Sequence, residues 1–181
     1  MKSNKEINEL LIKFKEFKDG KELDYQINLL ERTLKKIDEH YYLKELESPE
    51  IILIEHQKTE KLKEQLEKTE TKNILDLILP VETVQTNTNH ITTKILSKIK
   101  HKTKILDTFD ITCSIIGYST YYTTNELETI ISQRLKESLH IEKSIINPVW
   151  NIKIITIGPI TAINIRHTRK KETEDYLLQP A

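Results

Sequence analysis

Cationic side chains are the residues of this 181-residue sequence that most readily suggest a chemistry. Five lysines fall between His90 and Leu106 with no acidic residue among them, and four further cations gather after the last apolar run. Ammonium and guanidinium groups neutralise phosphates, so two such runs in one small domain predict the two sides of a groove for a phosphate backbone. A solvated face is the alternative interpretation. The cations are Lys94, Lys98, Lys100, Lys102, Lys104, Arg166, Arg169, Lys170 and Lys171.

Three tyrosines form a second candidate group. Tyr118, Tyr121 and Tyr122 follow Gly117 in a polar stretch that precedes a predicted helix. Aromatic rings in such a loop can stack on unpaired bases. Alternatively, they cover the edge of a core and keep their hydroxyls in water.

Most catalytic constellations are missing from the sequence. With only Gly20, Gly117 and Gly158 available, no dinucleotide-binding loop, P-loop or nucleophile elbow can be written. The six histidines lie 11 or more residues apart, and the single Cys113 excludes a disulfide framework and a cysteine-based zinc site. Carboxylate pairs occur only in charged segments, where nothing would raise a pKa. We therefore expect no catalytic residue, metal or cofactor, although a Ser, His and Asp arrangement assembled by the fold would escape sequence reading.

The charge balance places a polyanion-binding face in the second half. Residues 1–78 hold 15 Lys and Arg against 18 Asp and Glu, and residues 79–181 hold 13 against 10. The halves are therefore at −3 and +3, and the whole chain is neutral. The lone cysteine, the lack of a long apolar run and a lysine-interrupted start predict a cytoplasmic protein without a membrane span or signal peptide.

Apolar spacing in residues 1–80 predicts alternating strands and helices in the order βαββαβ, the ferredoxin-like pattern. Pro80 is expected to end the last strand, because proline cannot donate to a ladder. The predicted strands are 8–14, 40–46, 51–56 and 74–79, and the helices carry Leu23, Ile27, Leu30, Leu34 and Ile37 and then Leu62 and Leu66.

Residues 81–168 are predicted to form a second α/β domain, with 169–181 as a charged tail. Thr123 and Glu126 have the spacing of a capping box that opens a helix. Asn147-Pro148 and Gly158-Pro159 are each expected to mark the boundary before a strand. Gly158-Pro159 could form a tight hairpin, although proline at the second loop position suits few hairpin turns. A helix carries Ile91, Ile95, Leu96 and Ile99, and the strands are 109–115, 150–157 and 160–165.

Five segments of the sequence resemble those of a THUMP domain in order and spacing. They are LILPVETV (77–84), TFDITCSIIG (108–117), NELETIISQRL (125–135), INPVWNIKI (146–154) and AINI (162–165). The resemblance implies an RNA-binding module of tRNA-modifying proteins that follows a ferredoxin-like domain. Catalytic members append a further domain, whereas this chain ends 16 residues after Ile165. It is most similar to the stand-alone adaptors for tRNA cytidine acetylation.

The resemblance implies a non-enzymatic protein that holds the acceptor end of tRNA for a separate modifying enzyme, with an acetyltransferase expected. The acidic first half would dock that enzyme or set the distance. The chain departs from the family pattern at Ser114, Ile115 and Ile116, where basic residues are common, and at Val149, where an acidic residue is usual. A scaffold or dimerisation module without RNA binding is therefore the alternative.

Overall fold

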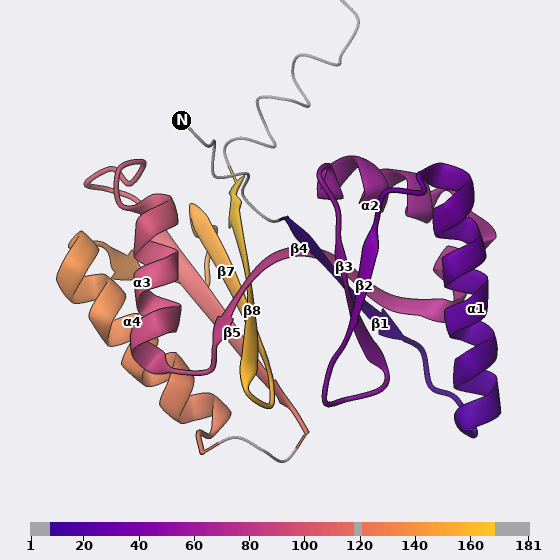
Figure 1. Ribbon diagram of the computed structural model, residues 1–181. Helices are drawn as coiled ribbons and strands as arrows, with labels where there is room; N and C mark the ends of the chain where they lie inside the picture. Colours follow the sequence, from indigo (N-terminus) through magenta and orange to yellow (C-terminus); the bar gives the residue numbers. More distant parts are fainter. Residues whose placement is uncertain (1–7, 118–120, 169–181) are drawn as a thin grey trace, which may run out of the picture. The chain divides into compact units, whose positions relative to one another are not determined.

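The computed structural model describes residues 8–117 and 121–168 (Figure 1). The chain divides into two compact units, Met1–Glu82 and Thr83–Ala181. The strand β4 contains the boundary between them, since it runs from Leu75 to Gln85.

The first unit alternates strands and helices as its apolar spacing predicts. Its strands follow the order β2-β3-β1-β4, and every neighbouring pair is antiparallel. The helices α1 and α2 flank this sheet (Figure 1). The ferredoxin-like assignment stays a prediction. The elements are β1 (Glu9–Phe14), α1 (Gly20–Ile37), β2 (Tyr42–Glu45), β3 (Ile51–Glu55), α2 (Thr59–Glu67), the 3-10 helix η1 (Glu70–Ile74) and β4 (Leu75–Gln85).

The helix α1 is held by an apolar face and a polar cap. Leu30 and Leu34 are fully buried in the core of the first unit. Burial of one such side chain stabilises the fold by about 1.5–3 kcal/mol. The N-cap Asp19 accepts a hydrogen bond from the backbone N–H of Glu22 at 2.9 Å, which satisfies one of the free donors of the first turn.

The prediction that Pro80 ends a strand is wrong. Pro80 lies within β4 opposite Leu10 of β1, and the ladder continues with Val81 opposite Glu9. Proline removes only its own N–H from a ladder, and its fixed φ suits extended backbone. The strand therefore runs on to Gln85, beyond the end that the sequence predicted at residue 79.

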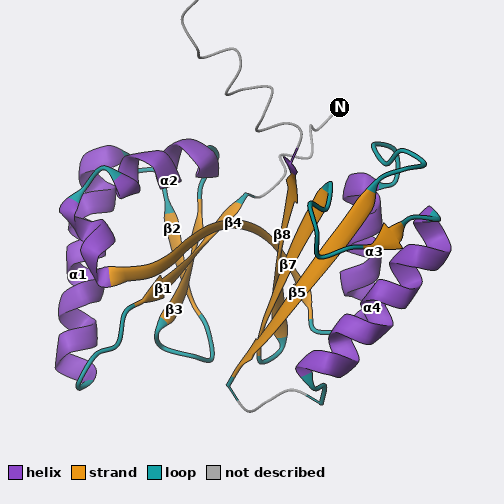
Figure 2. Ribbon diagram, turned by 180° about the vertical axis from the view of Figure 1, so that it is seen from behind, coloured by secondary structure: helices purple, strands orange, loops and turns teal. Residues whose placement is uncertain are grey.

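The second unit is a four-stranded sheet with two helices on one face (Figure 2). Its strands follow the order β8-β7-β5-β6; β5 is parallel to β6 and β7, and β7 is antiparallel to β8. The predicted strands and helices are confirmed, and β6 is an element that the sequence did not reveal. The elements are α3 (Thr88–Ile99), β5 (Thr108–Ile116), α4 (Thr124–Leu139), β6 (Glu142–Lys143), β7 (Trp150–Ile157) and β8 (Ile160–His167).

Alternation along the strands builds the core between sheet and helices. Phe109 and Ile111 of β5 are buried with Ile131 and Leu135 of α4 and Ile95 of α3. The side chains between them on β5 point to the opposite face, because a strand has a period of two. The capping box is present as predicted, with both of its hydrogen bonds at the start of α4.

Gly158-Pro159 forms a two-residue hairpin loop, since Ile157 pairs with Ile160. Gly158 has φ 55°, and proline fixes φ near about −65°. A positive and then a negative φ is the sign pattern of a type II′ turn, one of the two that suit a tight hairpin. At the other predicted boundary, Asn147-Pro148, Asn147 also has a positive φ, of 46°.

Among the described residues, no helix has the length and apolarity to cross a membrane.

Candidate nucleic-acid interface

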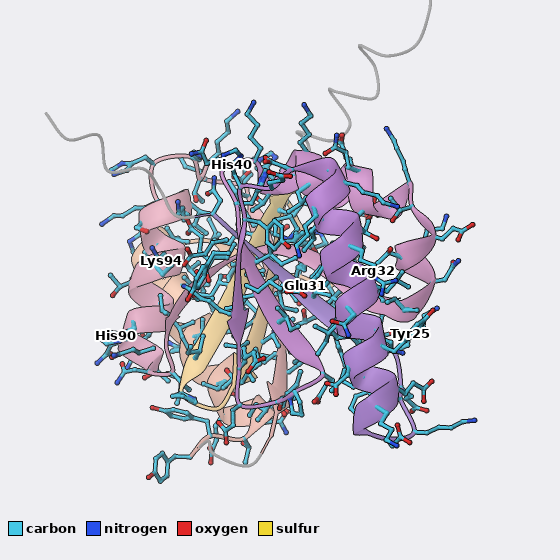
Figure 3. The ribbon with its side chains drawn as sticks, turned by 45° about the vertical axis from the view of Figure 1, so that its right-hand side comes forward. Tyr25, Glu31, Arg32, His40, His90 and Lys94 are labelled. Carbon is cyan, nitrogen blue, oxygen red and sulfur yellow. The ribbon has the colours of Figure 1, made fainter. Side chains whose placement is uncertain are left out.

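The helix α3 carries a histidine and two lysines outside its core-facing side. Ile91 and Ile95 face the core, whereas Lys94 and Lys98 are half-buried on other sides of the helix. His90 lies four residues before Lys94, and Figure 3 shows both on the same helix. Residues four apart in a helix are surface neighbours, so His90, Lys94 and Lys98 form one row.

Three exposed lysines follow at the C-cap of α3 and in the loop after it, namely Lys100, Lys102 and Lys104. Asp107, only 3% exposed, anchors the loop. Its Oδ2 atom accepts from the backbone N–H of Lys104 at 2.9 Å and from the indole Nε1 of Trp150 at 3.2 Å. A buried carboxylate with two donors fixes the backbone of the loop at Lys104.

The α3 cationic surface is the name used below for Lys94, Lys98, Lys100, Lys102 and Lys104. All five predicted lysines of the first run belong to this one helix and the loop that follows it. No acidic residue lies between His90 and Leu106. A phosphate backbone would therefore meet no like charge from this segment.

Arg166 does not flank the same groove, which corrects the expectation of two runs on its two sides. Its register partner is Asn151, which in turn pairs with Asp110. Ile152 and Ile111 face the helices, so the alternate residues Arg166 and Asp110 face the other side of the sheet. Strand alternation thus separates Arg166 from the α3 cationic surface. Arg169, Lys170 and Lys171 lie outside the described residues.

Tyr121 and Tyr122 lie at the opposite end of β5 from the loop that carries Lys102 and Lys104. That strand has nine residues and spans about 26 Å at roughly 3.3 Å per residue. Tyr121 is fully exposed, whereas Tyr122 is half-buried and packs against the core of the second unit. Tyr122 therefore matches the core-edge alternative, and Tyr121 remains available to stack. Tyr118 lies outside the described residues.

A polar pocket between α3 and α4 brings in residues that sequence reasoning missed. The Nη1 atom of Arg134 lies 2.5 Å from Oδ1 of Asn89, across a separation of 45 residues. Arg134 is the only arginine between residues 33 and 165, which was the one signal available from the sequence. The pocket is lined by Asn89, Thr92, Thr93, Arg134, Glu137 and Ser138.

The surroundings of Cys113 and Glu128 indicate a structural role for both side chains. Burial raises the pKa of the Cys113 thiol to about 12, with a smaller contribution from the nearby Glu128 carboxylate. Such a thiol is uncharged at neutral pH and is a poor nucleophile. Glu128 itself pairs with Lys143. Among residues 8–117 and 121–168, no group of three or more His, Cys, Asp or Glu side chains could hold a metal ion.

Comparison of structures identifies proteins that share this fold, whereas comparison of sequences does not. No family model matches the sequence, and no curated protein matches it significantly. The structure of PH1313 from Pyrococcus horikoshii is similar with a TM-score of 0.63 and 14% identity, over 88% of this chain and 54% of PH1313. A 4-thiouridine synthetase in complex with RNA and ATP is similar at a TM-score of 0.59 and 12% identity, over 89% of this chain and 41% of the synthetase.

TrmN from Thermus thermophilus also shares the fold, with a TM-score of 0.52 and 9% identity over 95% of this chain and 50% of TrmN. The chain thus spans about half the length of these structures or less. Together they show that it has a THUMP-like fold of mixed α and β structure. This agrees with the resemblance found in the sequence.

Proposed function

We propose that this protein binds tRNA without catalysing a reaction and presents the acceptor end to a separate modifying enzyme. The observation that carries the proposal is the α3 cationic surface, five lysines on one helix and its following loop with no acid among them. The shared fold supports it, because one structure with this fold is a 4-thiouridine synthetase in complex with RNA. Phosphate contacts from lysine would supply affinity that is independent of sequence.

Each unit has its own part in the proposed mechanism. The α3 cationic surface contacts phosphates, and Tyr121 stacks on an unpaired nucleotide of the single-stranded end. The first unit, with its excess of acidic residues, suits contact with a protein better than contact with RNA. The partner we propose is a tRNA cytidine acetyltransferase, and the compartment is the cytoplasm.

The absence of catalysis by this chain is part of the proposal. Its support is chemical: Cys113 is held as a neutral thiol, and His56 is committed on both ring nitrogens. His56 Nε2 lies 2.9 Å from Asp38 Oδ2, while Nδ1 accepts from the backbone N–H of Lys58 at 2.9 Å. Both nitrogens of the His56 ring are therefore engaged within the protein.

The test is fluorescence anisotropy of the purified protein with labelled tRNA across a salt series. We expect saturable binding that weakens as salt rises and weakens again when the single-stranded 3′ end is removed. Absence of binding at low salt, where attraction between opposite charges is strongest, would overturn the proposal.

A scaffold or dimerisation module is the second candidate, and exposed apolar side chains favour it. Ile105 and Leu106 are 91% and 88% exposed, and Ile145 and Ile146 are also exposed. Light scattering after size exclusion distinguishes the two. A concentration-dependent dimer that Leu106→Ser abolishes, in a protein that fails to bind tRNA, would establish the scaffold reading.

A further inference from the structure

The pocket between α3 and α4 has the chemistry of a ligand site that lies beside the α3 cationic surface. Its volume is about 300 Å³, and four of its lining residues are exposed, so it opens to solvent. Asn89 and Thr93 form its α3 wall and are the immediate neighbours of His90 and Lys94 in the sequence. Successive helical residues lie about 100° apart, so the row of His90, Lys94 and Lys98 occupies the side of α3 next to this wall, and an RNA chain bound along the row would run beside the pocket.

Most of the polar side chains that line the pocket can donate hydrogen bonds. Arg134 donates to the Asn89 side-chain oxygen and, among the described residues, forms no ion pair with a carboxylate. Its guanidinium fork offers further N–H groups in the planar arrangement that suits two oxygens of one phosphate. The Asn89 amide nitrogen and the hydroxyls of Thr93 and Ser138 add neutral donors.

One negatively charged group, the Glu137 carboxylate, also lines the pocket. Its Oε1 atom accepts from Nε2 of Gln133 at 2.8 Å, which leaves Oε2 for another donor. A bare phosphate would be repelled by this carboxylate, and a ligand without a negative charge would make no use of Arg134. The ligand that satisfies both carries an anion and a hydroxyl close together. In nucleic acids, only RNA places a hydroxyl beside every phosphate, on the 2′ carbon of ribose.

We propose that this pocket binds one ribose–phosphate unit of an RNA chain. Arg134 holds the phosphate, and Glu137 accepts a hydrogen bond from the 2′-hydroxyl. The assignment rests on the proposed function and adds to it a residue-level basis for preferring RNA to DNA. It also places Arg134 in the RNA surface, although it lies outside both cationic runs of the sequence.

The experiment compares a short single strand in its ribo and 2′-deoxy forms, with tRNA as a reference, by anisotropy across a salt series. Arg134→Gln is expected to weaken RNA binding about tenfold, the value of one charge-assisted hydrogen bond. It should also lower the slope of log affinity against log salt by about 0.7, the contribution of one phosphate contact on a single strand. Arg134→Lys keeps the charge and loses the fork, so it should retain the slope but not the full affinity.

Glu137→Ala is expected to reduce the ratio of RNA to DNA affinity about fivefold, because the hydroxyl loses its acceptor while the phosphate loses a repelling neighbour. The matched controls are Arg32→Gln on α1 and Glu64→Ala on α2, both exposed in the first unit and expected to change neither quantity. Thermal melts check that each variant folds.

The outcomes separate the two proposals. If the unmodified protein does not bind tRNA at low salt, the proposed function fails, and this site fails with it. If it binds tRNA while Arg134→Gln binds equally well, or if Glu137→Ala leaves the RNA to DNA ratio unchanged, only the pocket assignment is overturned.

Discussion

Trp150 donates a hydrogen bond from its indole nitrogen to the buried carboxylate of Asp107, which joins the first residue of β7 to the lysine loop 43 residues earlier. The same Oδ2 atom accepts from the backbone of Lys104. Asp107→Ala would leave both donors without this partner, and we expect a loss of about 2 kcal/mol in the free energy of unfolding. Urea denaturation measures it, and a change below about 0.5 kcal/mol, the size usual for surface substitutions, would contradict the anchoring role.

Charge reversal at the α3 cationic surface should weaken tRNA binding. Lys94→Glu and Lys102→Glu each remove one cation and add one anion, so we expect a loss of about tenfold or more. The salt slope should fall by about 0.7 to 0.9 for each lost phosphate contact, the values for single strands and for B-DNA. Lys61→Glu on α2 is the matched control, since Lys61 is an exposed helical lysine of the first unit. Equal losses for all three would show a general charge effect and not a surface.

The two described tyrosines should respond differently to substitution by alanine. Tyr121→Ala is expected to leave stability unchanged and to weaken binding of a single-stranded end by about 1–3 kcal/mol, the usual value of base stacking. Tyr122→Ala is expected to lower the free energy of unfolding by about 2 kcal/mol, because the ring packs against the core. Chemical denaturation measures the stability of each variant, and anisotropy measures its binding. A loss of stability for Tyr121→Ala together with a loss of binding for Tyr122→Ala would overturn both assignments.

The thiol of Cys113 should be unreactive in the folded protein. With a pKa raised to about 12, only a very small fraction is thiolate at neutral pH. We expect slow modification by a disulfide reagent in native buffer and fast modification in denaturant, with the native rate rising as the pH approaches 12. A native rate equal to that of the unfolded chain would disprove the burial argument.

Asp38, the C-cap of α1, bonds His56, the residue that follows β3, and should make stability depend on pH. Its pKa is lowered from 3.8 to about 2, chiefly because the carboxylate accepts from the backbone N–H of His40 and also bonds the His56 ring. The ionised group therefore stabilises the native state above pH 3.8, and this contribution disappears as the pH falls towards 2. Asp38→Asn should be less stable than the unmodified protein at neutral pH, with a difference that closes across that window. A difference independent of pH would refute the charge as its source.

Local features such as helix caps, strand boundaries and strand alternation could be predicted from the sequence because they depend on neighbouring residues. The capping box of Thr123 and Glu126 spans one helical turn, and Gly158-Pro159 marks a break between two strands, because glycine tolerates a positive φ and proline fixes its own φ. The strict alternation from Phe109 to Ile115 fixes a strand with one buried face. Pro80 shows the limit of this reasoning, since whether a proline ends a strand depends on which partner lies beside it.

The amino-acid sequence by itself determined the order of strands and helices apart from η1 and β6, the lysine-rich segment after His90 and the resemblance to a THUMP domain, because periodicity, caps and composition are properties of adjacent residues. Only the tertiary structure decided that Arg166 faces the far side of its sheet and that Arg134 lies against Asn89. Side chains far apart in the sequence meet only where strand register and helix packing bring them together, and both are set by burial of the apolar core. For this reason the charges could be counted from the sequence, whereas the surfaces they form could not.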